Sequence, residues 1–279
     1  MNPSGQTVRS LIDYFAKTNP NKEFVFYPES GRRFTWREFQ IRVRSIAKNI
    51  SALKLPKELP ITCLIGNGQA SLEFFLGGMY GGFQVFLANP LAGPDILAYV
   101  VEHSETEIFF VVPQYEELMK KAFSKISKTP KIIPTHPENG PEWHNFDLDK
   151  KKILKTPKSN DNALLIYTSG TTGKPKGVVH THNSLIHGGL NTQLAHELTS
   201  NDKTLCILPL YHINAQVVSV ISSIVSGSGL VLPERFKISE FWSNIVNEKC
   251  TWFSAVPTVF SYLMNSELNN KLKEKLNNL

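Results

Sequence analysis

Short apolar runs and amphipathic stretches alternate along most of the chain, and this alternation constrains the fold more than any other feature. The pattern predicts strands at residues 23–27, 61–65, 84–87, 108–112, 163–167, 177–181, 204–208, 230–232 and 251–256. It predicts helices at residues 7–17, 70–80, 94–103, 185–198, 213–225 and 238–247, and a last helix that starts near Pro257. Strands and helices that alternate at this spacing are typical of βαβ units. We therefore predict an α/β fold with a mostly parallel sheet.

One further helix has a clear start signal. Thr35 and Glu38 form a capping box, in which each side chain satisfies a backbone N–H that has no partner inside the helix. The apolar residues behind it recur every three or four positions, which predicts one buried face. These residues are Trp36, Phe39, Val43, Ile46, Ile50 and Leu53.

The composition is that of a globular protein. Of 279 residues, 41% are hydrophobic and 19% are charged. The net charge is +6, but the basic residues are spread out, and the densest stretches, 150–158 and 271–275, have no interleaved aromatic residues. The charge therefore indicates solvated surface and not a nucleic-acid site. Residues 130–162 are rich in Pro, Lys, Asn and Asp, which predicts a loop or a subdomain linker.

The sequence predicts neither a membrane span nor a secretory leader. The most apolar stretch, 217–232, is too short and is interrupted by serines and glycines. A secretory leader needs an uninterrupted apolar stretch, but charged residues interrupt the N-terminal 17 residues. Cys63, Cys206 and Cys250 lie far apart within or beside apolar runs. This pattern predicts reduced thiols in a cytoplasmic protein.

The segment from Thr168 to Gly177 carries the strongest chemical signal. It holds four hydroxyl side chains, three glycines and two lysines within ten residues. Glycine lets the backbone approach a ligand closely, and successive N–H groups in such a turn can bind an anion. Together with the hydroxyls and the two ammonium groups, these features suit a polyphosphate.

Two known glycine motifs do not fit the chain. A Walker A loop needs four residues between its glycines, but only two separate Gly170 from Gly173, and Pro175 stands where Ser or Thr is needed. Apolar runs flank the segment on both sides, so we expect the loop to join two strands. The segment Gly66-Asn67-Gly68 lacks the third Gly or Ala of a dinucleotide fingerprint, because Ser71 stands at that position. We expect it to form a tight turn.

Residues Tyr167-Thr-Ser-Gly-Thr-Thr-Gly-Lys-Pro-Lys-Gly177 resemble the phosphate loop of the acyl-adenylate-forming enzymes. This family includes acyl-CoA synthetases, the adenylation domains of peptide synthetases, and luciferases. Phe34-Thr-Trp-Arg-Glu-Phe39 and the stretch from Gly227 to Phe236 are similar to other family segments. Pro209-Leu-Tyr-His-Ile-Asn-Ala-Gln216 and Val256-Pro257-Thr258 resemble acyl-CoA synthetase segments beside the acyl pocket. The resemblance implies sheets with helices on both faces, as in the large N-terminal domain of acyl-CoA synthetases.

The resemblance also implies roles for individual residues. His212 would be catalytic, as a gate beside the acyl group and the α-phosphate, and Val256 and Pro257 would join it in binding the acid. Thr168 would also be a ligand of Mg²⁺. The residues implied to bind the β- and γ-phosphates of ATP are Thr168, Ser169, Gly170, Thr171, Thr172, Gly173, Lys174 and Lys176. The implied substrates are a carboxylic acid, ATP and coenzyme A.

Several later motifs of the family are absent from the sequence. These are the segments that hold Mg²⁺ and the ribose, and the mobile C-terminal domain with its catalytic lysine. We therefore expect residues 1–279 to be part of the N-terminal domain and to be inactive alone. The resemblance predicts a fatty or other carboxylic acid–CoA ligase. Two alternatives stay open: an adenylation module that loads a carrier protein, and a non-catalytic fragment. Assembly into a homo-oligomer is a separate open question.

Five of the eight histidines fall between residues 180 and 212. His180 and His182 are on the same face of a predicted strand, a spacing that would allow a metal site. No Cys, Asp or Glu accompanies them at ligand spacing, except Glu197 beside His196. We therefore prefer structural or surface roles for His180, His182 and His187.

Overall fold

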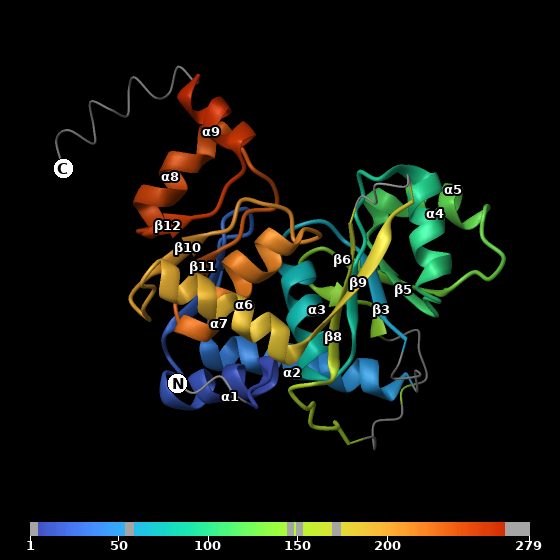
Figure 1. Cartoon of the computed structure of the whole chain (residues 1–279), viewed down its shortest axis with the longest axis horizontal. Helices are drawn as coiled ribbons and strands as arrows, with labels where there is room; N and C mark the ends of the chain where they lie inside the picture. Colours follow the sequence, from blue (N-terminus) through green and yellow to red (C-terminus); the bar gives the residue numbers. More distant parts are fainter. Residues whose placement is uncertain (1–4, 54–58, 144–147, 149–152, 169–173, 266–279) are drawn as a thin grey trace.

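The computed structural model describes residues 5–53, 59–143, 148, 153–168 and 174–265. Two sheets lie on either side of a central group of helices (Figure 1). The strands are β1 (Glu23–Tyr27), β2 (Arg32–Thr35), β3 (Ile61–Leu64), β4 (Val85–Leu87), β5 (Ile108–Val111), β6 (Lys131–His136), β7 (Gly140–Pro141), β8 (Asn162–Thr168), β9 (Lys176–Thr181), β10 (Lys203–Leu205), β11 (Gly229–Val231) and β12 (Trp252–Phe253). The α-helices are α1 (Val8–Thr18), α2 (Trp36–Ala52), α3 (Gln69–Tyr80), α4 (Gly93–His103), α5 (Glu116–Phe123), α6 (His182–Ala195), α7 (Ser222–Ser226), α8 (Ile238–Glu248) and α9 (Pro257–Met264).

Both sheets are mostly parallel, as the alternation predicts. One has five strands in the order β12-β10-β11-β1-β2, and the other has seven in the order β7-β6-β5-β3-β4-β8-β9. Only the pairs β1–β2, β6–β7 and β8–β9 are antiparallel among the described strands. Parallel strands need a crossover that covers one face of the sheet, and in this chain the crossovers are mostly helices.

Side chains on the two faces of the seven-stranded sheet enter different cores. In β5, Phe110 packs toward α2 and α3 in the core between the sheets, with Phe74 of α3 at a ring distance of 4.6 Å. Phe109 packs on the other face against α4 and α5, with Phe123 of α5 at 5.1 Å. Successive strand residues point to opposite faces, so a strand buried on both faces is apolar throughout. The fold therefore has helices on both faces of this sheet.

The capping box at Thr35 forms as predicted. The Glu38 backbone N–H donates to the Thr35 hydroxyl at 3.3 Å, and the Thr35 backbone N–H donates to the Glu38 carboxylate at 2.8 Å. Trp36 and Phe39 behind it are fully buried. Trp36 stacks on Phe24 of β1 at a ring distance of 4.0 Å, which fixes α2 against the five-stranded sheet.

The stretch 130–162 is not only a loop or linker. Its first part forms β6, which extends the seven-stranded sheet beside β5, and β7, which pairs with β6. The sequence prediction missed these strands because β6 contains Pro134 and ends in polar residues. The Pro134 carbonyl accepts from the Glu142 N–H at 2.9 Å and so faces β7, whose register covers only Thr135 and His136. The nitrogen of a strand residue points to the same side as its carbonyl, so the missing donor does not interrupt the pairing with β5. Strand β2 and helix α5 were also missed.

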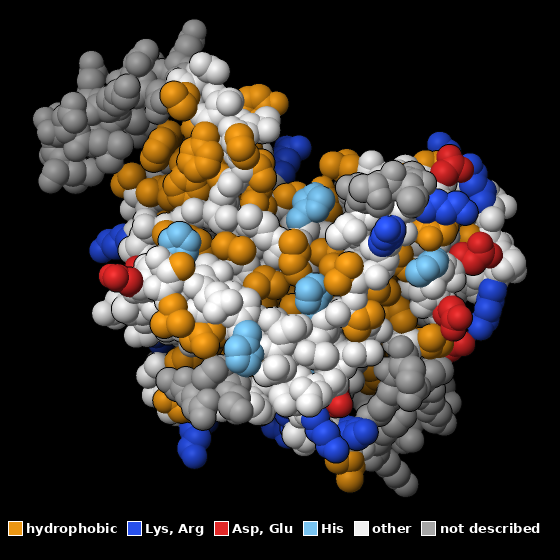
Figure 2. Space-filling model, viewed as in Figure 1, with side chains coloured by type: hydrophobic (Ala, Val, Ile, Leu, Met, Phe, Trp, Pro, Cys, Tyr) orange, Lys and Arg blue, Asp and Glu red, His pale blue; other side chains and the backbone are white. Residues whose placement is uncertain are grey.

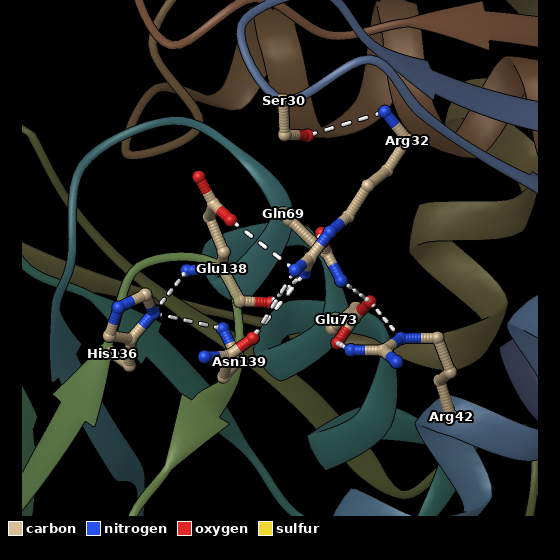
Figure 3. Close-up of polar contacts among 8 residues, drawn as sticks. All are labelled: Ser30, Arg32, Arg42, Gln69, Glu73, His136, Glu138 and Asn139. Carbon is tan, nitrogen blue, oxygen red and sulfur yellow. Dashed lines mark hydrogen bonds and ion pairs between the residues drawn. The ribbon is translucent and has the colours of Figure 1, made fainter.

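A polar network connects the two sheets (Figure 3). Arg32 of β2 donates to the Gln69 side chain at 3.2 Å and to the Glu138 carbonyl, between β6 and β7, at 3.1 Å. Gln69 in turn donates to Glu73 at 2.9 Å, and Arg42 of α2 forms a two-pronged ion pair with the same carboxylate. Glu73 is almost fully buried, so its charge depends on Arg42.

None of the helices in the described part of the chain is long and apolar enough to cross a membrane. Apolar side chains on α8, on α9 and at the start of α9 are exposed on the side shown in Figure 2, and with the adjoining strand β12 they form what we call the α8–α9–β12 face. Its exposed residues are Val246, Val256, Phe260, Tyr262 and Met264. Strand β12 is also an edge of the five-stranded sheet. Contiguous exposed apolar surface beside an open strand edge favours association.

We expect this chain to self-associate through the α8–α9–β12 face. Met264, with 75% of its surface exposed, and Val246, with 45%, are suitable positions for change. Met264→Lys and Val246→Lys should shift sedimentation profiles toward the monomer, because each puts a charge on the face. Ile41→Lys, at a 60% exposed site on α2, is the matched control and should not. A wild-type chain that stays monomeric at high concentration would contradict the prediction.

His182 gives the fold a pH-dependent stability. It is the first residue of α6, is fully buried, and accepts a hydrogen bond from the Val8 N–H at 3.4 Å. Burial lowers its pKa from 6.5 to about 4, with Asp161 partly opposing the shift. The unfolded chain therefore binds this proton at higher pH than the folded chain does. Its contribution to stability is complete above about pH 6.5 and falls as the pH drops toward 4.

Because of His182, we expect the free energy of unfolding to fall by about 2 kcal/mol between pH 7.5 and pH 5. The fall is roughly 1.4 kcal/mol per pH unit below the ordinary histidine pKa. His182→Gln should remove this part of the pH dependence of the unfolding free energy, measured by urea titration at the two pH values. The exposed His187→Gln is the control and should retain the wild-type dependence. An unchanged pH dependence in His182→Gln would show that the buried imidazole is not the cause.

Candidate functional site

Strands β8 and β9 form an antiparallel hairpin, so the glycine-rich segment joins two strands, as expected. Ser169, Gly170, Thr171, Thr172 and Gly173 lie outside the described residues. Thr168 and Lys176, at the two ends of the loop, are direct partners across the hairpin. Opposite residues of an antiparallel pair point to the same face, so the Thr168 hydroxyl and the Lys176 ammonium can act on one ligand.

Helix α4 supports the hairpin through two residues that the sequence analysis missed. The Tyr167 hydroxyl and the His103 Nδ1 are 2.8 Å apart in a hydrogen bond. The Lys174 ammonium lies 5.6 Å from the centre of the Tyr99 ring, a cation–π contact. Tyr99 and His103 are four positions apart and therefore share one helix face. Their spacing is the one sequence signal that could have pointed to them.

A cavity of about 740 Å³ opens between the hairpin, α4 and the segment that follows β10. It lies at the carboxyl ends of the parallel strands β4 and β8, where ligand sites of α/β proteins usually occur. Its lining residues are Phe86, Leu87, Asn89, Ala92, Ile96, Leu97, Val100, Ile166, Tyr167, Thr168, Pro175, Leu208, Pro209, Tyr211, His212, Ile213, Asn214 and Val256.

The cavity wall is apolar with a few polar groups. Among the described residues that line it there is no aspartate or glutamate. The polar groups besides the tyrosines are Asn89, Thr168, His212 and Asn214. An apolar wall with few polar groups suits a ligand with an apolar body, and the lack of acidic groups suits a ligand with a negative end.

The cavity brings together three of the residues singled out from the sequence. Thr168, His212 and Val256 come from three distant segments and all line it. Lys174 and Lys176 do not line it, but Pro175 between them does. Pro257 follows Val256 as the first residue of α9 and is not among the lining residues.

His212 stands at the exposed side of this wall. Its ring lies 4.6 Å from the Tyr211 ring, and its backbone N–H donates to the Pro209 carbonyl at 3.0 Å. Partial burial lowers the pKa of its imidazole below the ordinary value of 6.5. The ring is therefore mostly uncharged at neutral pH and can donate or accept a hydrogen bond.

The segment after His212 differs from the predicted helix. Residues Asn214–Ile221 form a π-helix, which continues as α7. A π-helix is uncommon and is often found beside functional sites. It packs closely on α6, where a Cβ at Gly189 would lie 3.0 Å from the Ile221 backbone. The small residue at Gly189 therefore allows the two helices to approach.

The other histidines in the described part of the chain are spread over separate contacts. No group of three His, Cys, Asp or Glu side chains in the described residues could hold a metal ion. His182 is buried at the start of α6 and not on a strand face with His180. His187 is exposed and hydrogen-bonded to the Asn183 carbonyl, and His196 stacks on Trp252 at 5.6 Å. Structural or surface roles for these histidines fit the contacts.

Comparison with known proteins identifies the family. Residues 12–279 match the model of the AMP-binding enzyme family. This chain belongs to the AMP-binding enzyme family. The match covers the β8–β9 hairpin, His212 and Val256, so the elements around the cavity are family elements.

Its relatives in this family are CoA ligases. The chain is 33% identical to the sulfoacetate–CoA ligase of Cupriavidus necator over 264 residues, which cover 93% of this chain and 51% of that protein. It is 24% identical to the medium-chain-fatty-acid–CoA ligase of Ectopseudomonas oleovorans, over 96% of this chain and 52% of that protein. The chain thus spans about half the length of these relatives.

Solved structures show the same fold. The N-terminal domain of FACL13 from Mycobacterium tuberculosis superposes with a TM-score of 0.80 at 21% identity, over 94% of this chain and 66% of that chain. A fatty acyl CoA synthetase from the same organism gives a TM-score of 0.81 at 21% identity, over 95% of this chain and 52% of that chain. The AMP-binding family therefore accounts for the fold of the described residues.

Proposed function

We propose that this chain supplies the ATP phosphate loop and part of the acyl pocket of an acid–thiol ligase. The ligase activates a carboxylic acid as acyl-AMP and transfers the acyl group to coenzyme A. One observation carries the proposal: Thr168 at the phosphate loop, His212 and Val256 meet at one apolar cavity with no acidic lining residue in the described part of the chain. The CoA-ligase relatives support it.

The proposed chemistry has two steps. A carboxylate oxygen attacks the α-phosphorus of ATP, and pyrophosphate leaves with the electron pair of the broken P–O bond. The thiol sulfur of coenzyme A then attacks the acyl carbon, the bond from that carbon to the phosphate oxygen of AMP breaks, and AMP leaves with the electron pair while the thiol proton goes to solvent. The first step depends on positioning and on neutralising phosphate charge, which backbone amides, hydroxyls and the ammonium groups of Lys174 and Lys176 can provide.

His212 is the candidate catalytic residue. Its lowered pKa keeps the imidazole neutral at pH 7, so it would act as a polar gate between the acyl group and the α-phosphate and not as a fixed positive charge. Val256 on the same cavity wall, with Pro257 beside it, would contact the acyl group.

We propose a fatty acid as the substrate class. The lining side chains from β4, α4 and β8 are mostly aliphatic or aromatic, and a carboxylic acid with an apolar chain would bury surface against them. A relative that is named for medium-chain fatty acids supports this choice, whereas the sulfoacetate relative is named for a small, charged acid.

Mg²⁺ would accompany ATP in this reaction. This ion prefers oxygen ligands in an octahedral arrangement and is usually held in part by phosphate oxygens and water. The Thr168 hydroxyl is an oxygen donor at the cavity and fits as one ligand. The chemistry that Mg²⁺ supplies there is neutralisation of the phosphate charge.

We also propose a cytoplasmic location. Cys63, Cys206 and Cys250 are free thiols, the first two fully buried and the third half-buried. Burial raises the pKa of Cys206 and of Cys250 to about 12, so both stay protonated and unreactive at neutral pH. Free thiols are typical of a reducing compartment.

We expect Thr168→Ala and Lys176→Ala to weaken ATP binding by this chain, measured by calorimetry. A hydrogen bond to a charged phosphate contributes about 1.5–3 kcal/mol, so each change should raise the dissociation constant roughly ten- to a hundredfold. Lys158→Ala, which removes an exposed lysine away from the loop, is the matched control and should bind ATP normally. Normal binding by both loop variants would remove the loop from the site.

We expect the 279-residue chain alone to give no ATP–pyrophosphate exchange with a panel of carboxylic acids that includes octanoate and sulfoacetate. The family segments that hold the ribose and supply the catalytic lysine are absent from its sequence, so the α-phosphorus would lack alignment. Robust exchange by this chain would show that those segments are not needed.

A further inference from the structure

Asn67 follows β3 of the seven-stranded sheet and contacts the part of the cavity wall that follows β10 of the five-stranded sheet. Its Nδ2 donates to the Leu208 carbonyl at 3.1 Å, and the Leu210 backbone N–H donates to its Oδ1 at 2.6 Å. Both ends of one side-chain amide are thus used on a turn more than 140 positions away in the sequence. This turn leads directly into Tyr211 and His212.

The short segment that carries Asn67 has a fixed conformation. Gly66 and Gly68 on either side of it have φ angles of +80° and +123°, which side chains other than hydrogen rarely allow. A Cβ at Gly66 would also lie 3.0 Å from the Tyr115 hydroxyl. Gln69, which follows Gly68, is hydrogen-bonded to Arg32 and Glu73 in the network of Figure 3.

Gln216 holds the same turn from the opposite side. Its Nε2 donates to the Leu210 carbonyl at 2.7 Å, and its backbone N–H donates to the His212 carbonyl at 3.2 Å. Gln216 is 1% exposed and belongs to the π-helix. The Leu210 residue is therefore fixed at its N–H by Asn67 and at its C=O by Gln216.

A purely structural link between the sheets is the simpler explanation for Asn67. The sheets, however, already share a core and are joined by the Arg32 network. The Asn67 contacts are with the backbone of the turn Leu208–Leu210, which leads to His212, and not with a strand. Two backbone bonds to a turn restrain its position, and the side chains that follow it then have a defined place.

We propose that Asn67 is a positioning residue for the candidate site: by fixing the turn Leu208–Leu210, its amide places Tyr211 and His212 on the cavity wall. That this placement serves acyl transfer rests on the proposed function. The placement itself does not depend on it.

Histidine side-chain NMR of the full 279-residue chain tests the placement, with the His212 signal assigned from the spectrum of His212→Gln. Asn67→Ala releases the Leu210 N–H and should change the chemical shift of the His212 ring protons. The reason is the ring current of Tyr211, whose ring centre lies 4.6 Å from that of His212 in the wild type. The His212 titration midpoint should rise toward the ordinary histidine value. Gln216→Met, which removes the opposite bond with little change in volume, should shift both in the same direction.

Two comparisons separate positioning from loss of stability. Thr204→Val removes a buried hydrogen bond between β10 and Ser223 of α7 without touching the turn, so it should destabilise the chain and leave the His212 signal in place. The signals of the other seven histidines, His182 above all, should be unchanged in Asn67→Ala. An Asn67→Ala chain whose His212 signal and titration match the wild type would overturn the proposal, and so would an equal shift in Thr204→Val.

Added octanoate links the placement to the proposed function. It should shift the wild-type His212 signal, and at the same concentration it should shift that of Asn67→Ala less. A wild-type signal that does not respond would count against the proposed substrate class, while the His212 titrations without octanoate still decide the role of Asn67. An equal octanoate response in both chains would contradict positioning for the acid.

Discussion

Parallel strands cannot be joined by a tight turn, so the chain must cross back over the sheet before each new strand. The crossover segments, mostly helices, cover both faces of the sheet. In this chain that requirement produces a core between the two sheets and a second core under α4 and α5. Because these strands run in the same direction within each sheet, the segments that follow β4, β8 and β10 meet at one cavity. The cavity is thus a consequence of strand direction, and its chemistry comes from the side chains just past the strand ends.

The two sheets must also keep a fixed relation, because each contributes part of the cavity wall. Apolar contact between them is non-directional and does not define position to within a hydrogen-bond length. Directional contacts do: Arg32 reaches Gln69 and Glu138 on one side, and Asn67 reaches Leu208 and Leu210 beside the cavity. The buried Arg42–Glu73 pair adds to the first of these, because a buried carboxylate is costly unless it stays paired.

The strands and helices with strong periodicity were predictable, whereas weakly patterned elements were not. The α2 start at Thr35 and the buried strand β1 follow from local spacing. Strand β6 contains Pro134 and β2 carries Arg32 and Arg33, so neither has an apolar run, and each exists because a neighbouring strand offers backbone partners. Strands β10 and β12 are shorter than predicted because their apolar runs continue past the last paired residue.

The sequence by itself determined the alternation of strands and helices and the chemical character of the loop between Thr168 and Lys176, because both depend on residues close together in the chain. The tertiary structure alone decided that Thr168, His212 and Val256 share a cavity, that Tyr99 and His103 support the hairpin, and that Asn67 holds the turn before His212. Contacts between residues that are far apart in the chain leave no spacing pattern, since they arise only when the sheets and helices pack.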